Sequence, residues 1–129
     1  MQLKGQLSFE YMLIALIALS LVTISFAALS KIRENAEAQY EIQKTKAISL
    51  ELFTTIDEVC ALGNGNTRTL FIGKSLGISS GQTNTEYYIS LSDGTNSFSH
   101  TSYCHIHAKG VITNEISVEN ENGEIKIGK

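Results

Sequence analysis

The sequence lacks proline and tryptophan altogether, and it has only two cysteines among its 129 residues. Because proline is absent, no residue of that type breaks or kinks a helix anywhere in the chain. Two cysteines exclude a disulfide-dense scaffold, and 10 glycines exclude a collagen-like repeat. A hydrophobic content of 43% excludes disorder of the chain as a whole.

Positive charge is also scarce. Ten Lys and Arg residues stand against 13 Asp and Glu residues, which gives a net charge of −3 and no basic field for nucleic acid. The sequence has no P-loop, no G-x-S-x-G and no H-E-x-x-H pattern. We therefore expect no enzymatic activity, no cofactor and no nucleic-acid partner.

Charged side chains are missing entirely from Tyr11 to Ser30, where most residues are aliphatic. Twenty helical residues rise about 30 Å, the thickness of the hydrocarbon core of a bilayer. The segment is longer than the apolar part of a secretory signal peptide, and no break follows it. The mean hydropathy of +0.02 therefore averages a predicted membrane-spanning helix with a polar remainder.

Helix-forming residues continue from Lys31 to Leu62, where Gly63-Asn64-Gly65-Asn66 provides a stop signal. Within this stretch an apolar stripe recurs every three or four residues, at Ile48, Leu52, Ile56 and Val59. We expect one helix over Leu7–Leu62, about 84 Å long at 1.5 Å per residue. A 14.1 kDa globule cannot bury such a helix, so a membrane or neighbouring chains must share it.

From Thr67 onward the pattern changes to strands, and the predicted fold class is α+β. We expect a small antiparallel sheet, a head of marginal size that covers the stripe. The stretch Ser79–Ser102 is rich in Ser, Thr and Asn and indicates exposed loops and strand edges. Predicted strands lie at Thr69–Ile72, Glu86–Leu91, around Phe98, Tyr103–Ala108, Ile116–Val118 and Ile125–Ile127, with turns at Asp93-Gly94, Lys109-Gly110 and Asn122-Gly123.

The residues just before the apolar run form an unusual pattern, Lys4-Gly5-Gln6-Leu7-Ser8-Phe9-Glu10-Tyr11. Its most unusual member is Glu10, because a carboxylate in a membrane helix is expensive unless it is paired. Alternatively, Glu10 lies at headgroup level and only favours the helix N-terminus. The pattern, followed by a charge-free helix, resembles the archaeal type IV pilins with class III signal sequences, whose motif is Q-x-S-x-E-Y.

The resemblance implies that a prepilin peptidase cuts between Gly5 and Gln6. It also implies that the new α-amino group of Gln6 pairs with Glu10 of a neighbouring subunit during assembly. The product would be a helical homopolymer, an extracellular filament on the cell surface used for adhesion, made with an assembly ATPase and a platform membrane protein. The implied processing motif comprises Lys4, Gly5, Gln6, Ser8, Glu10 and Tyr11.

The expected organisation is a cleaved leader at 1–5, a transmembrane and filament-core helix at 6–30, an amphipathic continuation at 31–62 and a β-rich head at 63–129. Two alternatives stay open. The chain could be a minor pilin or tip component with a ligand-binding head, or a membrane-anchored ectodomain that does not polymerise. Archaellins are related candidates, but they generally lack the acidic residue at the position of Glu10.

The two cysteines, Cys60 and Cys104, most simply form one disulfide if the head is extracellular, the alternative being two buried thiols. Closing a loop of this length contributes about 3–4 kcal/mol through the entropy of the unfolded chain.

Three histidines raise the question of a metal site. His105 and His107 would share one face of a strand while Cys104 points to the other, and His100 is the only further histidine. A closed site needs more ligands than two histidines supply. We therefore expect exposed strand histidines and no metal.

Overall fold

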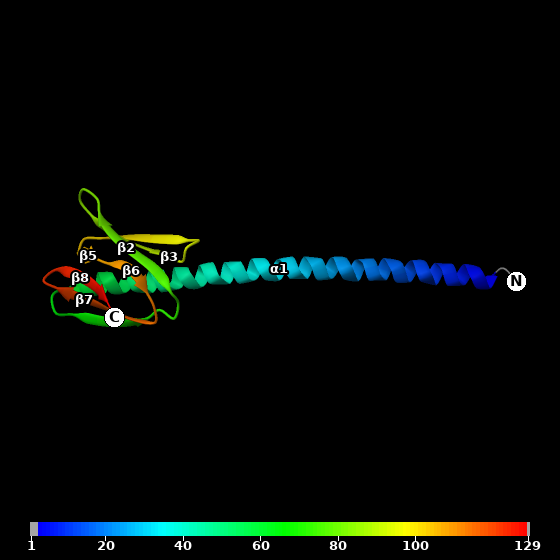
Figure 1. Cartoon of the computed structure of the whole chain (residues 1–129), viewed down its shortest axis with the longest axis horizontal. Helices are drawn as coiled ribbons and strands as arrows, with labels where there is room; N and C mark the ends of the chain where they lie inside the picture. Colours follow the sequence, from blue (N-terminus) through cyan, green and yellow to red (C-terminus); the bar gives the residue numbers. More distant parts are fainter. Residues whose placement is uncertain (1–2, 129) are drawn as a thin grey trace. The chain divides into compact units, whose positions relative to one another are not determined.

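The computed structural model describes residues Leu3–Gly128, with side chains described from Ser8 onward. A single helix precedes eight strands, and the predicted α+β class is confirmed (Figure 1). The helix α1 begins at Leu3, four residues before the predicted start, and ends at Leu62 as predicted. The strands are β1 (Thr67–Phe71), β2 (Leu76–Gln82), β3 (Tyr87–Ser92), β4 (Ser97–Ser102), β5 (His105–His107), β6 (Lys109–Ile112), β7 (Glu115–Glu121) and β8 (Glu124–Gly128).

The chain divides into two compact units, Met1–Glu41 and Ile42–Lys129. The described residues of the first all belong to α1, and their described side chains are exposed. Its charged part carries the pairs Lys31–Glu34 at 3.6 Å and Arg33–Glu37 at 2.9 Å. Exposed pairs at this spacing stabilise a helix only slightly.

The strands of the second unit form two four-stranded sheets rather than the one sheet that we expected. The first has the order β1-β7-β8-β5 and the second the order β4-β3-β2-β6. All pairs are antiparallel except β5 and β8, which run parallel. The hairpins predicted at Asp93-Gly94 and Asn122-Gly123 are confirmed, because these turns join β3 to β4 and β7 to β8.

The turn predicted at Lys109-Gly110 is wrong, because these residues belong to β6, where Gly110 pairs with Ile78. Strand β2 was not predicted. Its end, Ser79–Gln82, lies in the stretch expected to hold exposed loops and strand edges, and it pairs with β3. The Ser80 hydroxyl donates to the carbonyl of Ala108 and accepts from its amide. Pairing on both sides of β2 therefore outweighs the weak strand propensity of its small residues.

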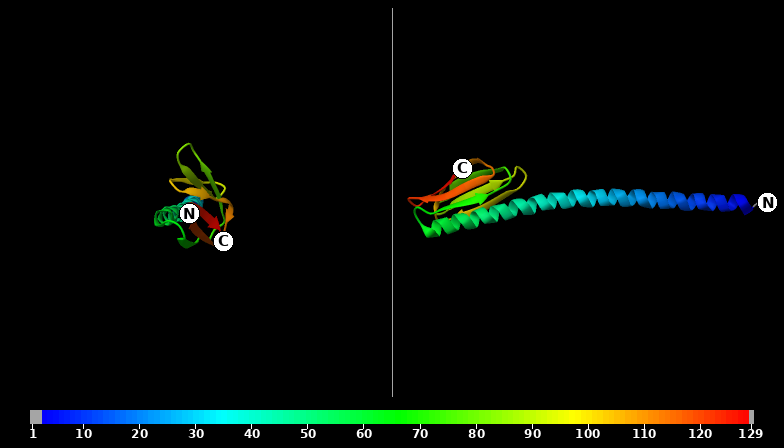
Figure 2. Two further views of the ribbon diagram at one scale, coloured as in Figure 1. Left: turned by 90° about the vertical axis from the view of Figure 1, so that its left-hand side faces the viewer. Right: turned by 90° about the horizontal axis from the view of Figure 1, so that it is seen from below.

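The head has one core, built on the helical stripe that the sequence predicted. Leu52, Ile56 and Val59 are fully buried, and Ile48 packs against them. Figure 2 shows the strands lying along one side of the last turns of α1. The strands contribute Ile72, Leu76, Ile78, Ile89, Leu91, Ile106, Ala108, Ile112, Ile116, Val118 and Ile125 to the same cluster.

Asparagine side chains close the C-terminal end of α1. Gly63 takes a φ of +83°, which is typical of the residue after a helix. The Asn66 side chain donates to the carbonyl of Leu62 at 2.9 Å. The buried Asn120 donates to the carbonyl of Val59 at 3.3 Å and accepts from the Gly123 amide at 3.0 Å. The end of the helix is thereby joined to the β7–β8 turn.

A buried polar cluster ties the β3–β4 turn to α1. Asp93 Oδ1 accepts from the amides of Thr95 and Asn96 at 3.0 and 2.7 Å. Its Oδ2 accepts from the Thr45 hydroxyl at 3.0 Å and lies 3.6 Å from Lys74 Nζ. These amide donors, the Thr45 hydroxyl and the nearby ammonium hold the pKa of Asp93 well below its ordinary value near 3.8.

We expect this cluster to make the head sensitive to acid. Because the pKa of Asp93 is lower in the folded state, its contribution is complete above about pH 5 and is lost as the pH falls further. The melting temperature of the head should therefore fall between pH 5 and pH 2.5, monitored by near-ultraviolet circular dichroism. Asp93→Asn should melt lower at pH 7 and lose most of this slope. Glu121→Gln is the control. The pKa of Glu121 is also lowered, but by an exposed pair with Lys126 that contributes little to stability, so this variant should keep the slope of melting temperature against pH. An unchanged slope in Asp93→Asn would contradict the assignment.

Candidate functional site

The residues of the predicted processing motif lie in the first turns of α1. The backbone of Lys4, Gly5 and Gln6 is helical, and their side chains lie outside the described part. Ser8, Glu10 and Tyr11 are exposed, with Tyr11 at 70%. The motif is thus presented along one continuous helical segment.

The apolar segment that follows is exposed on every side. Its large apolar side chains between Met12 and Leu29 are each 46–69% exposed. Apolar surface of this extent marks a membrane or protein contact. Among the described residues, α1 is the one helix long and apolar enough to cross a membrane, with a mean hydropathy of 2.6 in its most apolar window. By length and composition, α1 is therefore compatible with the predicted membrane anchoring.

The hydroxyl groups of this segment find their partners inside the helix itself. Ser20 donates to the carbonyl of Leu16 and Ser25 to that of Leu21, both at 2.8 Å. Thr23 donates to the carbonyl of Ser20 at 2.8 Å. Such bonds to the preceding turn leave no hydroxyl unsatisfied when the helix is surrounded by apolar groups.

Glu10 differs from these hydroxyl groups, because it is charged and has no partner among the described side chains. Within Ser8–Ser30 it is the only charged residue. Among the described side chains, no hydrogen bond or ion pair involves its carboxylate. The segment thus begins with one charge for which the described residues of the chain supply no counter-ion.

A disulfide joins Cys60, near the end of α1, to Cys104. Their Cα atoms are 6.1 Å apart, and 44 positions separate them in the sequence. Cys104 lies in the bend between β4 and β5 rather than inside a strand as predicted, because β4 ends at Ser102. The bond attaches this bend directly to the helix.

The three histidines do not come together. His105 lies 3.5 Å from Glu124, and His107 is opposite Lys126 on β8. His100, on β4, has its Nε2 2.9 Å from Asp57 Oδ2. Among the described residues, no group of three or more His, Cys, Asp or Glu side chains could hold a metal ion.

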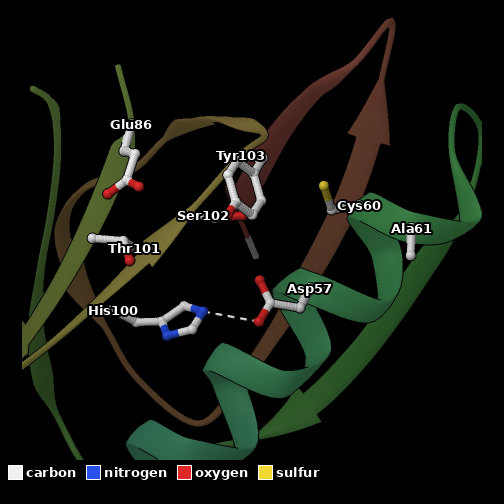
Figure 3. A pocket seen from close by; sticks show the side chains of 8 residues that line it. All are labelled: Asp57, Cys60, Ala61, Glu86, His100, Thr101, Ser102 and Tyr103. Carbon is white, nitrogen blue, oxygen red and sulfur yellow. Dashed lines mark hydrogen bonds and ion pairs between the residues drawn. The ribbon is translucent and has the colours of Figure 1, made fainter. Parts of the chain in front are cut away.

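A pocket of about 420 Å³, which was not predicted from the sequence, lies beside the disulfide (Figure 3). One wall comes from α1, through Asp57, Cys60 and Ala61. The rest is lined by Glu86, His100, Thr101, Ser102 and Tyr103. Its residues come from positions 57 to 103, in α1, in β4 and in the segments just before β3 and just after β4, so no local sequence pattern could have indicated it.

Comparison of the chain with protein-family models, with curated proteins and with solved structures finds no match.

Proposed function

We propose that the chain is the precursor of an archaeal type IV pilin, cut between Gly5 and Gln6 and assembled into a surface filament. The uncut chain would be anchored in the membrane by the apolar part of α1. After processing, these helices would form the core of the filament and the β-rich heads its outer surface. Assembly would require a prepilin peptidase, an assembly ATPase and a platform membrane protein.

The observation that carries the proposal is the charge of Glu10 at the start of an otherwise uncharged, exposed apolar segment. A carboxylate in such surroundings is costly alone and much less so beside a positive group. Cleavage before Gln6 would create an α-amino group, which is positively charged near neutral pH. Pairing this amine with Glu10 of a neighbouring copy would set the axial register of the subunits.

The apolar segment supports close packing of many copies. Its small residues let helix backbones approach each other, and its satisfied hydroxyl groups tolerate apolar surroundings. Its small side chains are Ala15, Ala18, Ser20, Ser25, Ala27 and Ala28.

We expect Gly5→Val to block processing, because a branched side chain at the residue before the cut would obstruct the peptidase. The measurement is a gel-mobility assay with the peptidase, followed by mass spectrometry of the N-terminus. Ile14→Val introduces the same side chain away from the cut and should be processed normally. A mature-sized Gly5→Val product would contradict the assigned site.

Electron microscopy of filaments sheared from the native cells, with mass spectrometry of their subunits, tests the proposal as a whole. A dominant subunit that begins at Gln6 would support a major pilin, and a trace subunit would point to a minor or tip component. Absence of the chain from all filaments would support the alternative of an anchored ectodomain that does not polymerise.

A further inference from the structure

Two walls of the pocket beside the disulfide, those formed by α1 and β4, are held in place from several sides. The bond from Cys60 to Cys104 joins the α1 wall to the bend that carries Tyr103. The His100 ring stacks on Phe53, with centroids 5.1 Å apart and planes 16° apart. A binding site with fixed walls loses little conformational entropy when a ligand enters.

The Asp57–His100 pair fixes the direction of one carboxylate in this pocket. Asp57 Oδ2 is engaged by His100 Nε2 at 2.9 Å. Figure 3 shows the other Asp57 oxygen turned away from His100, towards the side where Ser102 and Tyr103 lie. That oxygen remains available to accept a hydrogen bond from a ligand.

Glu86 supplies a second carboxylate on the opposite wall. It precedes β3, is half-buried, and among the described residues its carboxylate has no hydrogen-bond or ion-pair partner. No Lys or Arg lines the pocket. The lining therefore combines two carboxylates with hydroxyl acceptors and carries no permanent positive charge.

Tyr103 completes the chemistry of the pocket. Its side chain is 89% exposed at the pocket wall (Figure 3), so no packing within the head accounts for its position. The face of an aromatic ring attracts a cation, and it also covers an aliphatic stem. Ala61 adds further apolar surface to the same pocket.

We infer that this pocket binds an alkylammonium group, that is, a primary ammonium on an aliphatic stem. The ammonium pairs with the Glu86 carboxylate, the stem lies against Tyr103, and the Asp57 carboxylate on the opposite wall adds to the negative charge of the pocket. Such a group is carried by a lysine side chain of another polypeptide or by a free amine. The proposal does not depend on filament formation.

The test is titration of the full-length ¹⁵N-labelled chain in detergent micelles, followed by amide chemical shifts. The probes are Nα-acetyl-lysine amide and n-butylammonium, and the uncharged control probe is Nα-acetyl-norleucine amide. At least one amine is expected to give saturable shifts at Glu86, Thr101 and Tyr103, and norleucine amide none. Tighter binding of the lysine probe than of butylammonium indicates a polypeptide partner, and equal or weaker binding of the lysine probe indicates a free amine.

Two variants separate binding from folding. Glu86→Gln removes a charge without changing the shape of the side chain, and it should weaken amine binding about tenfold or more. Glu115→Gln, an equally conservative change at an exposed position outside the pocket, should bind as the unaltered chain does. The inference is overturned if neither amine gives saturable shifts, if norleucine amide binds equally well, or if Glu86→Gln retains full affinity.

Discussion

Replacing Glu10 with alanine is expected to abolish filament assembly while leaving cleavage between Gly5 and Gln6 intact. The substitution would leave the α-amino group of the neighbouring subunit without its counter-charge in an apolar environment. Losing one partner of a buried ion pair costs about 3–5 kcal/mol, which lowers the equilibrium constant for adding a subunit about a hundredfold or more. The measurement is the amount of sheared filament seen by electron microscopy, together with gel mobility to confirm processing.

Two further variants test whether loss of the Glu10 charge causes the loss of filament assembly. Glu10→Gln keeps the shape of the side chain and should fail in the same way. Glu34→Ala removes an exposed carboxylate that pairs with Lys31 at 3.6 Å, and it should assemble normally. Filaments from Glu10→Ala in normal amounts would refute the pairing of Glu10 with the amine.

Removing the disulfide is expected to have the largest effect on the stability of the head. The double substitution Cys60→Ser and Cys104→Ser should lower its free energy of unfolding by about 3–4 kcal/mol, because the unfolded chain regains the freedom of a long loop. Urea unfolding of the full chain in micelles measures this, followed by the near-ultraviolet signal of the tyrosines in the head. Far-ultraviolet signals are less suitable, since α1 dominates them.

Reductant provides the matched control for this prediction. It should destabilise the unaltered chain by a similar amount and leave the double variant unchanged. Equal unfolding midpoints for the two oxidised proteins would show that the bond adds nothing to stability.

Periodicity predicted the helical part of the fold well. The absence of proline and the stop signal at Gly63 placed the end of α1 at Leu62, and the stripe of Leu52, Ile56 and Val59 predicted the helical side of the core. The pair Asn122-Gly123 correctly predicted the hairpin turn between β7 and β8. Both residues have positive φ, 57° and 85°, as a tight hairpin of this kind requires.

Features that depend on contacts between residues far apart in the sequence could not be predicted from local periodicity and turn signals. Strand β2 owes its structure to partners on both sides rather than to its own small residues. The Asp93 turn was predicted as a hairpin, but its contact with Thr45 joins positions 48 residues apart. The pocket likewise is lined by residues that are distant in the sequence, such as Asp57 and His100, whose Oδ2 and Nε2 atoms lie 2.9 Å apart in the fold.

The hydroxyl groups that bond within α1 have a consequence for how easily this segment changes surroundings. Since Ser20, Thr23 and Ser25 keep their partners in the preceding turn, transfer from lipid to a bundle of helices would break none of these bonds. Such a transfer exchanges van der Waals contacts with lipid for van der Waals contacts between helices. In the proposed filament, pairing of Glu10 with an amine would then favour the bundle of helices.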